Sequence, residues 1–252
     1  MQYKPCVLIP VYNHPTTVKP LLQAISLYAL PVVLVDDGSE ESCRIVLQDL
    51  AREFESVHLL VLKQNRGKGG AVKAGLQEAQ RLGFSHAVQI DADGQHKVED
   101  IPDFIQHSQR NPTVLIAGKP IYDESIPKNR LYGRYLTHVW VWINTLSFQI
   151  EDSMCGFRVY PTEYSCQLID KVFLGERMDF DTEFLVRWWW AGGHIEQRGT
   201  SVTYPQDGIS HFNKLQDNWL ISKMHTRLFF GMLLRLPKLI FRSPGKEQWK
   251  YG

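Results

Sequence analysis

Two carboxylates follow a short, mostly apolar segment near the middle of the chain. Asp91 and Asp93 come directly after residues 87–90 and are two positions apart. Side chains two apart on an extended segment point the same way. Two carboxylates that face one point suit a hard divalent cation, Mg²⁺ or Mn²⁺, which is often shared with substrate phosphates. An acidic turn after a strand is the alternative, so the pair needs support from elsewhere in the chain.

Length and composition bound the possible folds. The chain has 252 residues, of which 44% are hydrophobic and 12% aromatic, enough for one large α/β domain or one domain with an extension. The net charge of +1 gives no support to nucleic acid binding. The charge is uneven, because residues 214–252 hold eight Lys or Arg against two acidic residues, a net +6 that leaves −5 for the rest.

The cysteines, the N-terminus and the apolar runs indicate a compartment. The four cysteines have no CxxC spacing and are typical of thiols in a reducing environment. The first residues lack a signal-peptide pattern, and no apolar run reaches the roughly 18 residues needed to span a bilayer. We therefore expect a cytoplasmic protein.

The carboxylates need elements that position them, and the first half of the chain alternates two hydrophobic patterns. Continuous apolar runs predict strands at residues 6–11, 31–35, 57–62, 87–90 and 114–117. Amphipathic runs predict helices at residues 17–27, 42–54, 70–82 and 98–109, with Pro20 in the first turn of the first one. This alternation favours a mostly parallel sheet flanked by helices on both faces, in which ligands bind beyond the carboxyl ends of the strands.

Four of these strand ends carry polar motifs in a specific order. They are Pro10-Val11-Tyr12-Asn13, Asp36-Asp37-Gly38-Ser39, the loop 65–71 and Asp91-Ala92-Asp93. In order and spacing the set resembles the N-terminal half of the family 2 glycosyltransferases of GT-A fold, and within them the polyprenyl-phosphate sugar transferases. The resemblance implies a Rossmann-like α/β GT-A domain over residues 1–213, followed by a basic amphipathic helical extension over residues 214–252.

The resemblance implies a nucleoside diphosphate sugar as the donor. Pro10, Tyr12 and Asp37 would line the nucleoside pocket, where Tyr12 packs against the nucleoside and Asp37 accepts hydrogen bonds from base or ribose. Asp-Gly also favours turns, so we expect one of the two carboxylates at 36 and 37 to be structural. Arg66 and Lys68 add positive charge in a loop whose glycines at 67, 69 and 70 allow a ligand to approach the backbone.

The resemblance also implies the Mg²⁺ or Mn²⁺ that the paired carboxylates suggest. Asp93 would be a ligand and a catalytic residue, since the cation stabilises charge on the leaving nucleoside diphosphate. Asp91 would bind the cation directly or contact ribose or a metal-bound water, and Gln95 would supply an amide oxygen. His96 fits a turn better than the ligand set. His211 lies in a segment that resembles the acceptor-side loop of the family; it either reaches the metal or diphosphate on loop closure or serves packing.

The segment 151–158 resembles the D-x-x-x-G-F-R motif of the family and indicates the acceptor side. Asp152 stands where many inverting members have a catalytic base, which a hydroxyl acceptor requires because its pKa is far above 7. A phosphate acceptor is already anionic and needs no base, so Asp152 would then orient a neighbouring arginine or the sugar. Arg158 either pairs with phosphate or forms a salt bridge within the fold. Arg130 and Arg134 share one helix face and either contact an acceptor phosphate or face solvent.

The C-terminal residues 218–242 combine basic and apolar side chains on a helical pattern. The basic residues fall within about a third of a turn, and they are Lys223, Arg227, Arg235, Lys238 and Arg242. Pro237 prevents one continuous helix, so we expect two short ones. The pattern suits an anionic membrane surface, and packing on the catalytic domain with a solvated basic face is the alternative. We expect peripheral attachment to the inner face of the cytoplasmic membrane.

These features predict a metal-dependent, inverting transfer of a sugar from a nucleotide diphosphate sugar to a membrane-presented, polyprenyl-phosphate-like lipid. One alternative is transfer to a hydroxyl of a glycolipid or other lipid-linked molecule, with Asp152 as base. An alternative of another class is a sugar-nucleotide-binding protein without turnover, against which the intact Asp91 and Asp93 pair argues. His14 and Gly118-Lys119-Pro120 depart from the polyprenyl-phosphate pattern, which leaves the sugar and the acceptor open.

Overall fold

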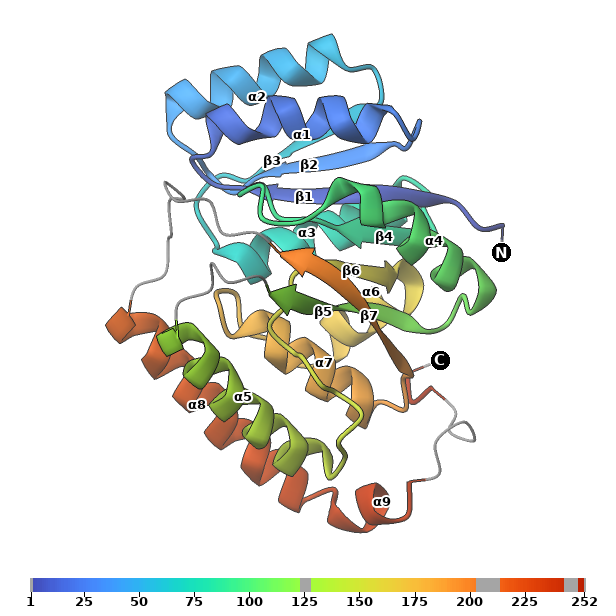
Figure 1. The fold of residues 1–252 in the computed structure, drawn as a ribbon, viewed down its shortest axis with the longest axis vertical. Helices are drawn as coiled ribbons and strands as arrows, with labels where there is room; N and C mark the ends of the chain where they lie inside the picture. The colour runs from blue at the N-terminus through green and yellow to red at the C-terminus, as the bar shows by residue number, and fades with distance from the viewer. Residues whose placement is uncertain (1, 123–127, 203–213, 243–248, 252) are drawn as a thin grey trace.

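The computed structural model describes residues 2–122, 128–202, 214–242 and 249–251. The described residues form a sheet of seven strands in the order β3-β2-β1-β4-β6-β5-β7 (Figure 1). In chain order the strands are β1 (Pro5–Val11), β2 (Val32–Asp36), β3 (Val57–Val61), β4 (His86–Gln89), β5 (Leu115–Tyr122), β6 (Arg158–Pro161) and β7 (Ile195–Val202). Strand β6 runs antiparallel to β4 and β5, and the other neighbouring pairs are parallel. The prediction of a mostly parallel sheet is confirmed.

Helices cover both faces of this sheet, and they are α1 (Pro15–Ser26), α2 (Glu41–Glu53), α3 (Lys68–Arg81), α4 (Ile101–Arg110), α6 (Thr162–Lys171) and α7 (Phe180–Trp190). In β1, Val7 and Ile9 pack in one apolar cluster with α1, α2 and α4. Cys6 and Leu8 pack in the other cluster with α3, α6 and α7. Because successive strand side chains point to opposite faces, a strand between two helical layers must be apolar throughout.

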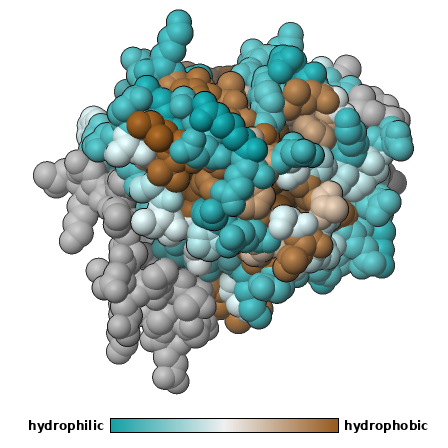
Figure 2. Space-filling model, turned by 90° about the horizontal axis from the view of Figure 1, so that it is seen from above, coloured by the Kyte–Doolittle hydropathy of each residue, from teal (hydrophilic) through white to brown (hydrophobic). Residues whose placement is uncertain are grey.

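The end of the molecule that carries α1 and α2 has a mixed surface. Figure 2 views this end from above and shows hydrophilic and hydrophobic side chains interspersed over it. Leu27, Ile45 and Val61 are the large apolar side chains of this part of the described chain that are well exposed. Isolated apolar side chains of this kind are ordinary on a protein surface.

Two boundaries differ from the sequence prediction for identifiable reasons. Helix α1 begins at Pro15, two residues earlier than expected, so the placement of Pro20 in the first turn is wrong and Pro20 lies inside the helix. A proline at the first helical position needs no N–H partner, and this favours the earlier start. Strand β6 was not predicted, because it has four residues and begins with the charged Arg158.

The C-terminal residues pack against the second half of the domain. They form α8 (Lys214–Leu233) and α9 (Leu236–Ile240), and α8 lies beside α5 (Lys128–Thr145) in Figure 1. The ring of Trp140 on α5 lies 5.9 Å from His225 and 6.2 Å from Phe229. Two helices were predicted, but the first is 20 residues long and the break precedes Pro237, which lies in the first turn of α9.

The basic stripe predicted for this extension is partly turned inward. Arg227 donates to Glu183 of α7 at 2.6 Å, Arg235 lies 4.7 Å from the ring centroid of Trp190, and Arg242 lies over Trp189. Lys223 and Lys238 are exposed. Three of the five basic side chains therefore stabilise the packing of the extension. Among the described helices, none combines the length and the apolar character needed to cross a bilayer.

Candidate active site

Two consecutive carboxylates lie at the carboxyl end of β2, the strand that pairs with β1. Asp36 is buried and accepts a hydrogen bond from the backbone N–H of Ser39 at 2.8 Å, which closes the turn after β2. Asp37 accepts from the side chain of Asn65 at 3.0 Å and from the backbone N–H of Arg66 at 2.8 Å. Burial raises the pKa of Asp37 to about 6. Asp36 is thus the structural member of the pair, while Asp37 ties the loop after β3 to this edge of the sheet.

The predicted nucleoside residues lie at that same edge. Pro10 pairs with Val35 in the sheet register, and both Pro10 and Tyr12 are partly exposed. Both lie at the carboxyl end of β1, which neighbours the β2 end that bears Asp37. The sheet therefore brings the three predicted residues to one region, and their contact with a nucleoside stays a prediction.

The glycines of the loop after β3 are used for packing against the segment before α7. A Cβ at Gly67 would lie 2.7 Å from the carbonyl oxygen of Glu176, and one at Gly69 would lie 2.3 Å from Cβ of Phe180. Arg66 donates to the Glu176 carboxylate at 2.6 Å. The missing side chains of Gly67 and Gly69 thus admit protein atoms, and the approach of a ligand to the backbone of this loop stays a prediction.

Asp91 and Asp93 follow β4 and have opposite electrostatic surroundings. Lys68 donates to Asp91 at 2.7 Å and also lies 2.9 Å from Asp181. Burial opposes ionisation of Asp91, but the charge of Lys68 outweighs it and lowers the pKa of that carboxyl. Asp93 accepts from the backbone N–H of Gln95 at 3.0 Å, and burial together with the charge of Asp91 raises its pKa.

A cavity at this point gathers side chains from distant segments. It is lined by Asp91, Gln95, His96, Pro120, Arg134, Met154, Cys155, Gly156 and Val202. The Nδ1 atom of His96 is buried without a hydrogen-bond partner, and its ring stacks on Phe157 at 5.6 Å. His96, expected as a turn residue, thus lines the cavity. Its contact with Phe157, which lies far away in the chain, could not be predicted from the sequence.

The paired carboxylates fit a divalent cation. Burial, together with repulsion from Asp91, raises the pKa of Asp93; a cation between the two carboxylates would relieve the repulsion, and carboxylate oxygens are hard ligands. Within residues 2–122, 128–202, 214–242 and 249–251, no group of three His, Cys, Asp or Glu side chains is close enough to hold a metal. His211 lies outside the described residues. Asp91 and Asp93 therefore fit a cation that takes further ligands from elsewhere, such as a bound diphosphate.

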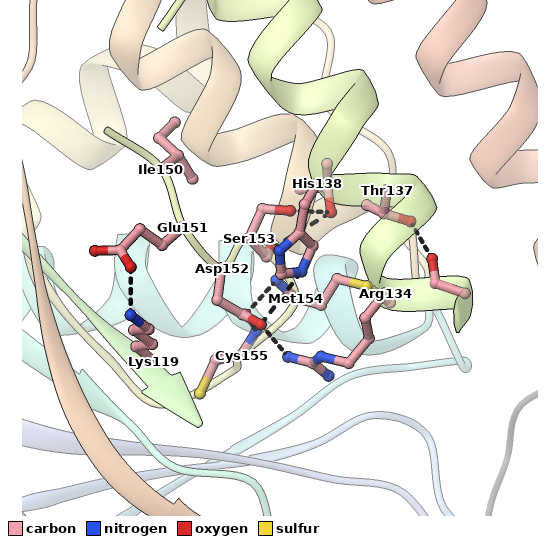
Figure 3. A network of polar contacts seen from close by, with 12 residues as sticks. Lys119, Arg134, Thr137, His138, Ile150, Glu151, Asp152, Ser153, Met154 and Cys155 are labelled. Carbon is pink, nitrogen blue, oxygen red and sulfur yellow. Dashed lines mark hydrogen bonds and ion pairs between the residues drawn. The ribbon is translucent and has the colours of Figure 1, made fainter. Parts of the chain in front are cut away.

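Behind the cavity lining formed by Arg134, Met154 and Cys155, the carboxylate of Asp152 is enclosed by donors (Figure 3). One oxygen accepts from the backbone N–H groups of Met154 at 2.9 Å and Cys155 at 2.8 Å. The other accepts from Arg134 at 2.6 Å and lies 3.4 Å from Nε2 of His138. Although burial opposes ionisation, His138 and Arg134 lower the pKa of Asp152 to about 2. Asp152 is therefore a weak base with both oxygens engaged.

The remaining arginines predicted for the acceptor have different outcomes. Arg134 lines the cavity. Arg158 has no exposed surface and donates to the carbonyl oxygens of Ser153, Cys155 and Asp181 at 2.8–2.9 Å, which favours the role within the fold over phosphate binding. The side chain of Arg130 lies outside the described part of the structure.

Comparison with known proteins places this site in a family. The glycosyl transferase family 2 model matches residues 6–176. The dolichyl-phosphate beta-glucosyltransferase of Dictyostelium discoideum is 28% identical over 202 residues, covering 71% of this chain and 60% of that protein. The polyprenol monophosphomannose synthase of Mycolicibacterium smegmatis is 27% identical over 172 residues, covering 62% of this chain and 61% of that protein. The chain thus spans about three fifths of the length of these two relatives.

Solved structures share the fold. Glucosyl-3-phosphoglycerate synthase from Mycobacterium tuberculosis, in complex with Mn²⁺, UDP-glucose and phosphoglyceric acid, aligns with a TM-score of 0.62 and 16% identity, covering 96% of this chain and 82% of that one. At this identity the likeness concerns the fold alone, and it confirms the GT-A architecture predicted from the strand ends. The matched family model covers more than half of the chain, so this protein belongs to glycosyl transferase family 2.

Proposed function

We propose that this chain transfers a sugar from a nucleoside diphosphate sugar to the phosphate of a polyprenyl-phosphate-like lipid, with inversion at the anomeric carbon and with Mg²⁺ or Mn²⁺ bound. Family membership and the carboxylate pair after β4 support the donor side. The M. tuberculosis structure, which holds Mn²⁺ and UDP-glucose, agrees with it. The names of the two relatives, which refer to dolichyl phosphate and polyprenol, support the lipid acceptor.

The observation that carries the choice of acceptor is the enclosure of Asp152. A hydroxyl acceptor needs a base with a pKa near the working pH, whereas Asp152 has a pKa of about 2 and both oxygens engaged. A phosphate acceptor is an anion at neutral pH and needs no base. The carboxylate therefore suits a phosphate acceptor better than a hydroxyl.

The proposed reaction gives each residue a role. An anionic oxygen of the lipid phosphate attacks the anomeric carbon while the bond from that carbon to the diphosphate breaks on the opposite face. Asp91, Asp93 and Gln95 would hold the cation, which stabilises charge on the leaving diphosphate. Arg134, held by Asp152 at 2.6 Å, would pair with the acceptor phosphate, because a guanidinium presents two parallel N–H groups to such oxygens.

A two-stage assay tests this proposal. Calorimetric titration with a panel of UDP-, GDP- and other nucleotide sugars, with Mn²⁺ and with chelator, should give a metal-dependent donor. That donor is then offered a short polyprenyl phosphate or the matching polyprenol, and the anomeric configuration of the product is read by NMR. We expect an inverted product with the phosphate and none with the alcohol. Transfer to the alcohol alone would overturn the phosphate acceptor, and donor binding without any turnover would favour the non-catalytic alternative.

We further propose that α5, α8 and α9 contact the bilayer that presents the lipid. Of 16 well-exposed large hydrophobic side chains in the described chain, 11 lie on these helices or their adjoining turns. Among them Trp219, Phe230 and Phe241 are 70%, 61% and 82% exposed. Such a concentration is typical of an interaction surface, and α5 also carries Arg134, so the same helix would face lipid and site.

Because the inward arginines leave little free charge on this surface, we expect apolar side chains to dominate membrane binding. Removal of the chain after Asn213 would expose Trp140 and its neighbours, so point variants are preferable. Phe230→Ser with Phe241→Ser should weaken cosedimentation with neutral and anionic vesicles alike. The matched pair Lys223→Gln with Lys238→Gln should weaken binding only to anionic vesicles, and less. Vesicle binding unchanged by the phenylalanine variants would refute this surface.

A further inference from the structure

A row of alternating charges connects the core to the carboxylates after β4. Arg158 Nη1 lies 3.7 Å from Asp181 Oδ1. The other oxygen of Asp181 lies 2.9 Å from Lys68 Nζ, which in turn lies 2.7 Å from Asp91 Oδ2. The row runs from β6 through α7 and the first residue of α3 to the segment after β4. Lys68 therefore shares one positive charge between two carboxylates that belong to different elements.

The surroundings fix Lys68 in this shared position. Its side chain and that of Asp91 are each 18% exposed, and that of Asp181 is 8% exposed. A Cβ added at Gly156 would lie 2.5 Å from Asp91 Oδ2 and 2.6 Å from Lys68 Nζ. The backbone at residue 156 thus closes against one side of the ion pair.

The ammonium stands where it competes with a divalent cation for Asp91. Charges a few ångströms apart at a partly buried site interact strongly, so Lys68 stabilises Asp91 as an anion but also opposes a second positive charge. Asp181 draws part of that charge away. How strongly Lys68 opposes a cation therefore depends on Asp181, which itself does not line the cavity.

We propose that Lys68 is the resident counter-charge of Asp91 and that Asp181 is a positioning residue that sets how much of this charge the cation must displace. The inference rests on the cation site of the proposed function. Asp181 lies in the first turn of α7, where a carboxylate is usually explained by the helix dipole. The inference gives it a further role, which is to position Lys68.

Mn²⁺ affinity without donor, measured by electron paramagnetic resonance of the free ion, tests the inference. Lys68→Met should bind Mn²⁺ about tenfold more tightly, because the competing charge is gone, and Asp181→Asn about tenfold more weakly, because Lys68 then serves Asp91 alone. The double variant should behave as Lys68→Met, since Asp181 acts through Lys68. A structural role for both residues would instead weaken binding in both single variants.

Controls separate this inference from the cation site itself. Lys73→Met removes the same charge from the same helix, where Lys73 pairs with Glu176 at 3.0 Å, and should leave Mn²⁺ affinity within about twofold. Asp93→Ala should abolish binding. If Asp93→Ala has no effect, the cation site fails and the inference with it. If Asp93→Ala abolishes binding but the Lys68 and Asp181 variants match the unsubstituted protein, the inference alone is overturned. Circular dichroism checks that each variant is folded.

Discussion

Asp93 and Asp152 both lie next to residues that line the cavity, but their partners differ. After β4, the carboxylate of Asp93 accepts one hydrogen bond from the described residues, and its pKa is raised by burial and by Asp91. Asp152 accepts hydrogen bonds from two backbone N–H groups and from the guanidinium of Arg134, and its pKa is lowered to about 2. A carboxylate without enough positive charge attracts a ligand, and one that is fully partnered holds its own segment.

The position of a residue in a motif therefore does not by itself decide what that residue does. Both aspartates stand in motifs that resemble functional positions of the family, yet their partners separate them. Removing one carboxylate at a time tests this difference, with ligand binding measured for Asp93 and the free energy of unfolding measured for Asp152.

The largest effect is expected from Asp93→Ala. Loss of this carboxylate should abolish Mn²⁺-dependent donor binding, because a hard cation loses a ligand that the described residues do not replace. Calorimetry with the donor that the panel of nucleotide sugars selects measures it. Asp103→Ala, an exposed carboxylate on α4, is the matched control. Unchanged Mn²⁺-dependent donor affinity in Asp93→Ala would refute the assignment of Asp93 as a metal ligand, and its contrast with Asp152 would no longer hold.

Asp152→Ala should lower the free energy of unfolding by about 3 kcal/mol, because it leaves the partly buried charge of Arg134 uncompensated. It also leaves the N–H groups of Met154 and Cys155 without their acceptor. Urea unfolding followed by circular dichroism measures the change. A loss below about 0.5 kcal/mol, typical of surface ion pairs, would mean that Asp152 does not hold its segment.

The stability that Asp152 provides should depend on pH in a defined direction. Its pKa is about 2 in the fold against an ordinary value of 3.8, so the stabilisation is present above pH 4 and is lost as the pH falls toward 2. The difference in unfolding free energy between the protein and Asp152→Asn should be about 2 kcal/mol at pH 7 and should shrink steadily below pH 4. Other carboxylates cancel in this difference. A difference that grows on acidification would contradict the lowered pKa.

The effect of Asp152→Asn on turnover should be smaller still. If the carboxylate only positions Arg134, the amide keeps an acceptor for the guanidinium and turnover should fall by less than about tenfold, whereas loss of a general base costs about 10²–10⁴-fold. Initial rates with the polyprenyl phosphate acceptor distinguish the two. A loss above 10²-fold in a folded variant would restore Asp152 as a base.

The sequence predicted the carboxylates after β4 and the strands that position them better than it predicted the surroundings of Asp152. The first four strands and their helices arise from local patterns, since continuous apolar runs form buried strands and a glycine with positive φ, Gly83 at +81°, follows the end of α3. The role of Asp152 depends instead on Arg134 and His138 of α5, and the burial of Arg158 depends on three carbonyl oxygens from two separate segments. Such partners meet only after the chain has folded.

Charge patterns along the chain misled for the same reason. A helical wheel places five basic residues of the extension on one stripe, but Arg227, Arg235 and Arg242 find Glu183, Trp190 and Trp189 on α7. Likewise, Lys68 was predicted to add positive charge near the nucleotide sugar, and the sequence did not indicate that it lies between Asp91 and Asp181. Sequence periodicity predicts the helix face on which a side chain lies, but it does not predict which side chains of another element contact that face.

The smallest effect is expected beside Asp152, at the exposed ion pair between Lys119 and Glu151 (Figure 3). Their side chains are 49% and 54% exposed, so solvent screens the attraction, and Lys119→Met should change the free energy of unfolding by less than about 0.5 kcal/mol. The same urea experiment measures it. Glu151 and Asp152 are neighbours in the chain, so the two variants test whether the burial and the hydrogen bonds of Asp152, rather than its place in the chain, account for its contribution to stability. If Lys119→Met lowered the free energy of unfolding as much as Asp152→Ala does, place in the chain alone would account for it.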